Sequence, residues 1–515
     1  MNRSTYASLP ERFFAPVNPT PVPKPRLVRF NKALAAELGL DFRDLDAEAL
    51  AQRFSGNVIP QGLEPIAMAY AGHQFGQFVP QLGDGRAILL GEAQDRGGVR
   101  RDIQLKGSGR TPYSRGGDGR AALGPVLREY LVSEAMHALG IPTTRALAAV
   151  ATGESVFRER VLPGAVMTRV AASLVRVGTF QYFAARNDVD GVRRLADYVI
   201  DRNFPNARAD ENPYLALLRA VTRAQASLIA KWMNVGFIHG VMNTDNMAVS
   251  GETIDFGPCA FMDSYDPAQV FSSIDSHGRY AFVNQPHAAV WNLARFAETL
   301  LPVIDTNADR AVELAAAVVT AFSAQFSEHW LAGARGKLGL STTEDGDPKL
   351  VDDLLKAMHR NQADFTLTFR ALCEAAECDG AEHRAGEAAG AEAAGAEGAA
   401  VSAGAASAAT AKLRSLFANP QEYDEWARRW RERLRRDPQE SQTRAEAMRQ
   451  VNPVVIPRNH RIEQVIIAAT EREDFGPFIE LSTVFSQPYR ACQGFESYAD
   501  PPRPDERVLR TFCGT

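Results

Sequence analysis

Residues 239–257 read His-Gly-Val-Met-Asn-Thr-Asp-Asn-Met-Ala-Val-Ser-Gly-Glu-Thr-Ile-Asp-Phe-Gly. This stretch decides the fold because it places Asn246 and Asp255 nine residues apart, at the two ends of a short apolar hairpin. We expect the strands of that hairpin at Met247–Ser250 and Thr253–Asp255. An amide oxygen and a carboxylate held in this way can bind one Mg²⁺ against the phosphates of a nucleotide.

The spacing of this stretch is that of the catalytic loop and Asp-Phe-Gly segment of protein kinases. His239 and Asn246 keep the offset of the kinase motif His-Arg-Asp-x-x-x-x-Asn, but Val241 stands where kinases carry the catalytic aspartate. A valine cannot accept a proton, which leaves Asp245 as the acid of the loop. A polar turn with a chance Asp-Phe-Gly is the simpler interpretation of the motif alone. The histidine and asparagine at kinase spacing favour a nucleotide site.

Composition limits the partners that the chain is expected to have. At 515 residues it is long enough for two or three domains. A net charge of −5 without long Lys/Arg runs argues against nucleic acid as the main partner. Neither a long apolar segment nor a secretory signal is visible, so we expect no membrane association. Five cysteines without a zinc or Cys-x-x-Cys pattern predict a reducing compartment, the cytoplasm, and we expect a monomer.

The predicted elements place a strand-rich unit before a helical one. The first thirty residues are rich in proline and are expected to form an extended arm. An amphipathic helix is expected at 120–139, and the neighbouring strands are expected at 87–91, 99–106, 146–150, 155–161 and 165–170. After Thr179 the chain becomes mostly helical. This order predicts an α+β, protein-kinase-like two-lobed fold: a strand-rich small lobe, a helical large lobe, an N-terminal arm and extra C-terminal helices.

Composition and element order divide the chain into five parts. They are an N-terminal extended arm with helices (1–66), a small lobe (67–178), a helical large lobe (179–379) with the catalytic loop (239–246) and Asp-Phe-Gly (255–257), a low-complexity Ala/Gly insertion (380–411), and a C-terminal helical extension with a Cys-containing tail (412–515). The insertion has almost no large apolar residue and cannot offset its ordering entropy, so we expect it to be disordered.

Two charged residues upstream of the catalytic loop have the order found in kinases. Lys106 ends a predicted strand, and Glu129 lies inside the predicted helix that follows. A strand lysine paired with a helix glutamate is how kinases direct an ammonium group at nucleotide phosphates. Two unrelated surface charges are the simpler interpretation of any single Lys–Glu pair. The order of lysine, glutamate, loop asparagine and Asp-Phe-Gly favours the functional pair.

Glycines and arginines gather around these residues. Gly83-Asp84-Gly85-Arg86 is typical of a hairpin turn, and in front of two strands and Lys106 it would cover a nucleotide. The stretch 107–120 is rich in Gly and Arg and is either a flexible linker or a phosphate-binding surface. Arg169 and Arg176 follow a predicted strand, where they are suited either to phosphate oxygens or to salt bridges between the lobes.

Together these residues resemble the selenoprotein O (SelO/YdiU) family of pseudokinase-like protein adenylyltransferases. The motifs that carry the resemblance are Tyr70–Gly76, Pro80–Arg86, Gln104–Ser108, Arg176–Phe180, His239–Asn246, Asp255–Pro258, Gly278–Tyr280, Asn284–Pro286, Asn452-Pro453 and Pro457–Asn459. The resemblance implies a kinase-like fold that binds ATP in the reverse orientation, with the α-phosphate next to the acceptor. AMP would then be transferred to Ser, Thr or Tyr hydroxyls of proteins, with release of pyrophosphate.

The resemblance also implies roles for single residues. Asn246 and Asp255 would hold Mg²⁺, with Mn²⁺ as an alternative. Asp245 would accept the proton as a carboxylate of ordinary pKa, and Glu129 would pair with Lys106. The residues implied to contact ATP are Gly83, Gly85, Arg86, Lys106, Asp118, Gly119, Arg169, Arg176 and Asp255. Transfer of UMP, kinase-type phosphoryl transfer and a non-catalytic nucleotide-binding scaffold stay open as alternatives.

The C-terminal cysteine is a further point of resemblance. Cys513, third from the end, stands where eukaryotic members of the family carry selenocysteine. A disulfide from this tail to the segment after Asp-Phe-Gly is disfavoured, because no cysteine lies between Cys259 and Cys373. Cys259 is expected to be a small packed side chain.

Overall fold

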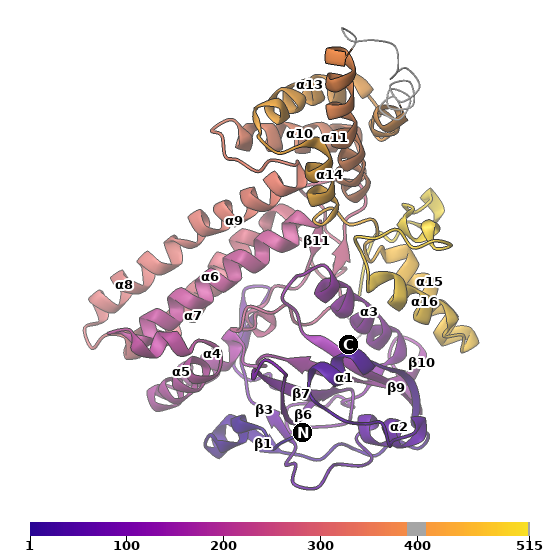
Figure 1. Cartoon of the computed structure of the whole chain (residues 1–515). Helices are drawn as coiled ribbons and strands as arrows, with labels where there is room; N and C mark the ends of the chain where they lie inside the picture. Colours follow the sequence, from indigo (N-terminus) through magenta and orange to yellow (C-terminus); the bar gives the residue numbers. More distant parts are fainter. Residues whose placement is uncertain (389–407, 513–515) are drawn as a thin grey trace.

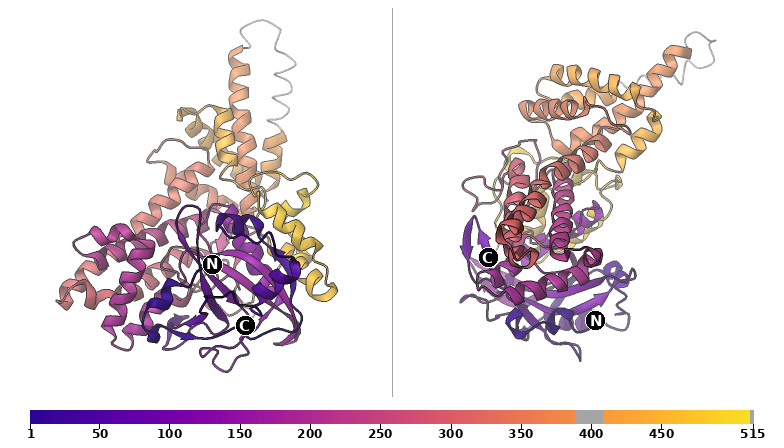
Figure 2. Two further views of the ribbon diagram at one scale, coloured as in Figure 1. Left: turned by 60° about the horizontal axis from the view of Figure 1, so that its bottom comes forward. Right: turned by 90° about the vertical axis from the view of Figure 1, so that its left-hand side faces the viewer.

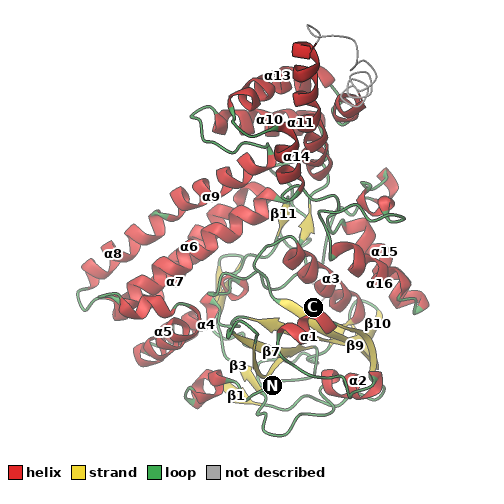
Figure 3. Ribbon diagram, viewed as in Figure 1, coloured by secondary structure: helices red, strands yellow, loops and turns green. Residues whose placement is uncertain are grey.

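The computed structural model of the chain describes residues 1–388 and 408–512 (Figure 1). Strands gather in one half of the molecule and helices make up most of the rest (Figure 3). The predicted α+β class is therefore confirmed. No helix in the described residues is both long and apolar enough to span a membrane.

The strand-rich half is built on one antiparallel sheet. Within the described residues it has eight strands in the order β1-β3-β6-β7-β10-β9-β2, with β8 paired to β10. Their bounds are β1 Phe14–Pro16, β2 Arg26–Phe30, β3 Ile66–Met68, β6 Ala87–Gln94, β7 Arg100–Lys106, β8 Ala121–Ala122, β9 Arg145–Phe157 and β10 Val161–Ala171. Two small ladders stand apart from it: β4 (Gly72–Gln74) with β5 (Gln77–Val79), and β11 (Phe237–Ile238) with β12 (Ala260–Phe261).

The register of the central strands brings three polar side chains to one face. Arg169 of β10 lies opposite Gln104 of β7, and Lys106 is two residues further along β7. Because side chains alternate between the faces of a sheet, Gln104, Lys106 and Arg169 point to the same side. Helix α3 (Leu123–Ala138) packs against β9 and β10.

Two expectations for the sheet are wrong. Residues 146–170 form two long strands instead of three short ones, because Gly153 adopts a φ of 75° inside β9 and the chain turns only at Arg158–Arg160, where the two backbones bond at 3.0 Å. The N-terminal arm is not merely extended, since β1 and β2 supply the two edges of the sheet. The intervening residues Pro19–Pro25 have no regular structure, and the short helices α1 (Lys32–Glu37) and α2 (Ala47–Ser55) follow.

The helical half contains a group of long helices beside the sheet. They are α4 Val177–Ala184, α5 Val189–Asn203, α6 Pro213–Asn234, α7 Gln285–Ile304, α8 Ala308–Thr320 and α9 Phe322–Lys337. α6 and α9 pack along each other, as do α7 and α8 (Figure 1). This group is held by one large hydrophobic core, which also includes residues of the sheet.

A second helical group projects away from the sheet (Figure 2). It consists of α10 Asp347–Asn361, α11 Phe365–Ala388, α13 Pro420–Arg436 and α14 Ser441–Arg449. α11 continues into the segment expected to be a disordered insertion, and residues 408–411 are also helical, in keeping with the strong helix propensity of Ala and Glu. The rest of that segment, 389–407, lies outside the described residues.

The chain then returns to the sheet-containing half. α15 (Asn459–Arg472) and α16 (Gly476–Phe485) pack on α3 (Figure 1). Near the end of the described chain, Thr511 pairs with the segment after Asp-Phe-Gly: its N–H donates to the Phe271 carbonyl at 2.7 Å and its hydroxyl donates to the Pro258 carbonyl at 2.5 Å. Cys513 lies outside the described residues.

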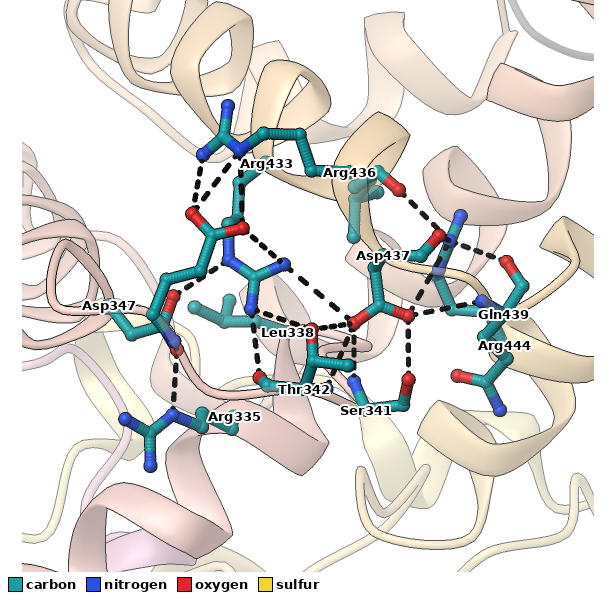
Figure 4. A network of polar contacts seen from close by, with 12 residues as sticks. Arg335, Leu338, Ser341, Thr342, Asp347, Arg433, Arg436, Asp437, Gln439 and Arg444 are labelled. Carbon is teal, nitrogen blue, oxygen red and sulfur yellow. Dashed lines mark hydrogen bonds and ion pairs between the residues drawn. The ribbon is translucent and has the colours of Figure 1, made fainter.

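A buried ion network fixes the projecting group (Figure 4). Arg433 on α13 donates to the Asp347 carboxylate at 2.8 Å and lies 3.7 Å from the Asp437 carboxylate. Asp347 is fully buried, and Asp437 also accepts from the backbone and hydroxyl of Ser341 at 2.7 Å each. Arg436, on the same helix, pairs with Glu344 at the surface, where its side chain is 57% exposed.

Replacing Arg433 with Ala is expected to lower the free energy of unfolding of this group by about 3–5 kcal/mol, because Asp347 and Asp437 both lose a buried cation and keep only Arg335 and Arg444 as charged partners. Arg436→Ala is the matched control and should change it by about 0–1 kcal/mol. The free energy of unfolding of both variants is measured by urea unfolding, followed by the fluorescence of Trp426 and Trp430. Their rings stack at 5.5 Å in α13. Equal losses in the two variants would contradict the assignment.

Candidate active site

Glu129 is the centre of a buried charge cluster between the sheet and α3. One of its carboxylate oxygens accepts from the Lys106 ammonium at 2.5 Å, and the other accepts from the Arg169 guanidinium. All three side chains are buried, and Arg169 is only 2% exposed. Burial alone would raise the pKa of Glu129, but Arg169 and Lys106 outweigh that effect and lower it. Glu129 is therefore ionised and holds both cations in place.

Lys106 also connects the sheet to the Asp-Phe-Gly segment. Its ammonium donates to Asp255 Oδ1 at 2.9 Å. Burial would raise the pKa of Asp255, but the cations Lys106, Arg169 and Arg86 hold it well below its ordinary value. Asp255 has a φ of 68°, a left-handed conformation that is uncommon for a residue other than glycine and that costs energy to maintain.

The catalytic loop differs from its prediction. The hairpin expected over residues 247–255 does not form, because each arm bonds to another part of the chain. The Val249 N–H donates to the Val175 carbonyl at 3.0 Å, and the Thr253 N–H donates to the Pro142 carbonyl at 2.9 Å. Between the arms, the Gly251 N–H donates to the Ala248 carbonyl at 3.1 Å and closes a turn. Thr244–Asn246 forms a short 3₁₀ helix.

His239 fixes the geometry of this loop. Its Nδ1 accepts from the Val241 N–H at 3.3 Å, so Nε2 carries the proton and donates to the Ile254 carbonyl at 2.9 Å. Burial lowers the pKa of His239, which keeps the ring neutral. The residue thus ties the loop to the backbone next to Asp255 and serves a structural purpose.

The predicted metal ligands have the chemistry that Mg²⁺ requires. The Asn246 amide nitrogen donates to the Val241 carbonyl at 3.1 Å, which leaves the amide oxygen as an acceptor. Asp255 is an ionised carboxylate whose side chain is partly open to solvent. The described residues contain no group of three His, Cys, Asp or Glu side chains that could hold a metal alone. Two oxygen ligands fit Mg²⁺ that completes its shell with phosphates and water.

Asp245 is a buried acid with an unused oxygen. Its Oδ2 accepts from the Gln74 amide at 3.3 Å, whereas its Oδ1 is buried and has no hydrogen-bond partner in the described structure. Burial raises the pKa of Asp245 to about 6, against the lowering effect of Arg176. The expectation of an ordinary carboxylate pKa is therefore wrong, because the β4–β5 hairpin removes this side chain from water.

Arg176 lies beside Asp245 and is also buried. It donates to the Asp245 backbone carbonyl at 3.0 Å, lies 3.7 Å from the Asp84 carboxylate and stacks over the Tyr70 ring at 4.5 Å. Asp84 in turn accepts from the Met68 N–H and the Gln104 amide, both at 3.1 Å. Asp84 was not predicted from the sequence as a structural centre. Its position between Gly83 and Gly85, two glycines implied in ATP contact, was the available signal.

The glycine- and arginine-rich stretch 107–120 packs on the Gly83–Gly85 turn and is not a free linker. The Thr111 hydroxyl donates to the Asp84 carbonyl at 2.6 Å. Gly83 has a φ of 76°, and a Cβ there would lie 2.3 Å from the Tyr113 ring. Gly119 is as tightly enclosed, since its Cβ would lie 2.1 Å from the Gly109 carbonyl oxygen. These glycines let two loops pack closely together.

Asp118 stands apart from the central cluster. It accepts two hydrogen bonds from Arg158, at 2.8 and 3.0 Å, and one from the Arg120 N–H at 2.9 Å. The structure thus gathers Lys106, Glu129, Arg169 and Asp255 around one point, and Asp245 with Arg176 beside it. It gives Asp118 contacts within its own loop and with the end of β9.

Arg128 was also missed by the sequence analysis. It precedes Glu129 on α3, donates to the Cys259 carbonyl at 2.6 Å and donates to the Asn459 side chain at 3.0 Å. It thereby joins α3, the segment after Asp-Phe-Gly and α15 at one point. Cys259 itself is a buried free thiol, in agreement with the expected packed side chain.

Comparison with known proteins identifies the class of enzyme. The sequence model of the family "Protein adenylyltransferase SelO" matches residues 2–486. The chain belongs to this family, as the motifs predicted, and it is a nucleotidyltransferase, an enzyme that uses a nucleotide substrate.

Three similar curated proteins carry the name protein nucleotidyltransferase YdiU. The protein of Rhizobium meliloti (strain 1021) is 60% identical over 512 residues, which cover 99% of each chain. That of Bradyrhizobium sp. (strain BTAi1) is 59% identical over 513 residues, 100% of this chain and 99% of the relative. That of Rhodopseudomonas palustris (strain BisB18) is 59% identical over 512 residues, 99% of this chain and 98% of the relative.

Replacing Gly72 with Ala is expected to lower nucleotidyl-transfer turnover by about 10²-fold, the scale of an ångström-sized misplacement. The new Cβ would lie 2.7 Å from Asp245 Oδ1 and would displace either the carboxylate or β4. Gly97→Ala, in an exposed turn without a left-handed φ, is the control and should keep full turnover. Wild-type turnover in Gly72→Ala would show that Asp245 is not held against β4 during catalysis.

Proposed function

We propose that this chain transfers AMP from ATP·Mg²⁺ to Ser, Thr or Tyr hydroxyls of proteins and releases pyrophosphate. The observation that carries the proposal is Asp245, a buried carboxylate with one unpartnered oxygen in the described structure. It directly precedes Asn246, the proposed metal ligand, in a loop where Val241 replaces the kinase base. The family and the names of the relatives support nucleotidyl transfer. A carboxylate at this position would accept the proton of an incoming hydroxyl, which supports a hydroxyl as the acceptor.

Asn246 and Asp255 would hold the metal ion, with Mn²⁺ as an alternative to Mg²⁺. The ion supplies charge neutralisation at the phosphates when it is bound. Lys106 has three N–H donors, of which one goes to Glu129 and one to Asp255, so the third is free for a phosphate oxygen. The ion pairs fix its direction before ATP binds, and such preorganisation is what electrostatic stabilisation requires.

Two buried arginines support a triphosphate bound in the reverse orientation. The Nε–H groups of Arg169 and Arg176 are both buried and have no hydrogen-bond partner in the described structure. Donors of this kind are costly unless a ligand accepts from them, and a phosphate oxygen is a suitable acceptor. Arg86 acts on the same site, since its charge helps to lower the pKa of Asp255. Gly83, Gly85, Asp118 and Gly119 are proposed to complete the nucleotide site.

We further propose that the fold is a protein-kinase-like pair of lobes, with a small lobe at 67–178 and a large lobe at 179–379. The antiparallel sheet with α3, followed by the helices α4–α9, supports this division. The protein substrates of the reaction, the monomeric state and a reducing cytoplasmic compartment stay predictions of the sequence.

Incubation with ATP labelled at either the α- or the γ-phosphate tests the reaction. We expect protein-bound label from α-labelled ATP only, because AMP is the group transferred. Asp255→Ala should remove metal-dependent labelling, because it takes away the carboxylate ligand. Retention from γ-labelled ATP alone would show kinase-type transfer instead. No labelling under any metal or redox condition would favour a nucleotide-binding scaffold, and label from α-labelled UTP would show UMP transfer.

The pH profile of turnover tests the proton acceptor. Asp245 must be ionised to take a proton, and burial raises its pKa to about 6. Turnover is therefore expected to fall as pH decreases through about 6 and to level off above it. Asp245→Ala should lower turnover by about 10²–10⁴-fold, remove this acid limb and leave ATP binding intact. Normal turnover in that variant would exclude Asp245 as the base.

A further inference from the structure

We propose that Arg279 forms a docking site for an aspartate or glutamate close to the acceptor hydroxyl in the protein substrate. This inference rests on the proposed function and adds a substrate class to it: protein segments in which the modified residue has an acidic neighbour. It is built from two motifs that contact the catalytic loop but supply none of the proposed metal or ATP ligands, Tyr70–Gly76 and Gly278–Tyr280.

The first motif covers the catalytic loop. The His73 N–H donates to the Thr244 hydroxyl at 2.7 Å, and the Phe75 N–H donates to the Asn243 side chain at 3.0 Å. Together with the bond from Gln74 to Asp245, these contacts seat the β4–β5 hairpin directly on the residues next to the proposed base. The hairpin therefore lies next to any acceptor that contacts Asp245.

The second motif is anchored to the same loop. The Tyr280 hydroxyl donates to the Asn243 side chain at 2.8 Å, and its ring lies 5.3 Å from that of Phe75. Asp275 accepts from the backbone N–H groups of Arg279 and Tyr280, at 2.9 and 2.8 Å. The backbone of Arg279 is thus fixed relative to the catalytic loop.

The Arg279 guanidinium is held by aromatic rings instead of by an acid. It lies over the Trp291 ring at 4.7 Å and the Tyr280 ring at 5.7 Å. It also faces the hairpin, since a Cβ at Gly76 would lie 3.6 Å from Arg279 Nη1. Stacking on an indole restricts the guanidinium to one plane while leaving its edge available for a carboxylate.

The local charges leave Arg279 without a carboxylate partner, although its guanidinium donates a hydrogen bond to the Tyr280 hydroxyl. Across residues 1–388 and 408–512, no carboxylate forms an ion pair with it, and its Nε is buried without a hydrogen-bond partner. Asp275 already accepts two backbone N–H groups, and Arg295, also over the Trp291 ring, pairs with Glu298 at 2.5 Å. A carboxylate brought by the substrate would form a charge-assisted bond here.

The position of Arg279 favours the protein substrate over the nucleotide. Lys106 and Arg169 lie on the sheet and bind Glu129, whereas Arg279 follows Asp-Phe-Gly in sequence and packs on α7 and on the β4–β5 hairpin. Phe78 of β5 is 40% exposed, and its ring lies 4.9 Å from His73. A cation and an exposed ring beside the catalytic acid suit an acidic peptide segment.

The experiment compares two pools of fluorescein-labelled peptides, each with one Ser, Thr or Tyr. The flanking residues are Asp in one pool and Lys in the other. Binding is measured by fluorescence anisotropy with a non-hydrolysable ATP analogue and Mg²⁺, and transfer is measured with α-labelled ATP. We expect the wild type to bind the Asp pool about 10-fold more tightly, Arg279→Gln to lose the preference, and Arg279→Glu to reverse it. The KM for ATP should not change.

Arg53→Glu is the matched control, because Arg53 also stacks on a ring, that of Phe42 at 5.5 Å, but belongs to α2 in the N-terminal region. It should keep the wild-type preference. Equal binding of both pools by the wild type, an unchanged preference in Arg279→Glu, or a raised KM for ATP in Arg279→Gln would overturn the proposal. An Arg279-dependent preference in binding without any transfer of label would uphold the docking site and refute AMP transfer.

Discussion

The site depends on one buried carboxylate that forms ion pairs with two buried cations. Glu129 divides its oxygens between Lys106 and Arg169, and Lys106 extends the same chain of charges to Asp255. Removing one charge from such a buried group leaves the other charges uncompensated. The resulting loss of stability is far larger than that from breaking a surface ion pair. The sheet, α3 and the Asp-Phe-Gly segment are therefore held in one arrangement by electrostatics as well as by packing.

The parts of the site that the sequence predicted are those with a regular repeat or spacing. Apolar and polar residues alternate in the strand before Lys106, and apolar residues recur at every fourth position in the helix around Glu129, so this pair could be predicted from the sequence. The structure of residues 247–255 could not be predicted, because a short apolar run has the same pattern whichever segment it bonds to. Here its backbone bonds to Val175 and Pro142 and not to itself as a hairpin. The division of 146–170 into strands failed for the same reason, since only the register with β10 shows that Gly153 lies inside a strand.

The electrostatic state of the site was the least predictable property. Asp245 has its raised pKa because Gln74 and Gly72, about 170 residues earlier in the chain, close over it. Burial of a single polar side chain leaves no periodic signal in the sequence. The same reason explains why no structural role was predicted for Asp84, Arg128 and Arg279. Each is a single charged residue whose surroundings come from distant segments.

The contact between Arg128 and Asn459 has a consequence for how the protein is made. The two residues are 331 positions apart in the chain, and the same arginine holds the Cys259 carbonyl behind Asp-Phe-Gly. During translation, the sheet, α3 and the catalytic loop leave the ribosome long before α15 exists. The contact that joins α3 and the segment after Asp-Phe-Gly to α15 therefore forms only after most of the chain has been synthesised.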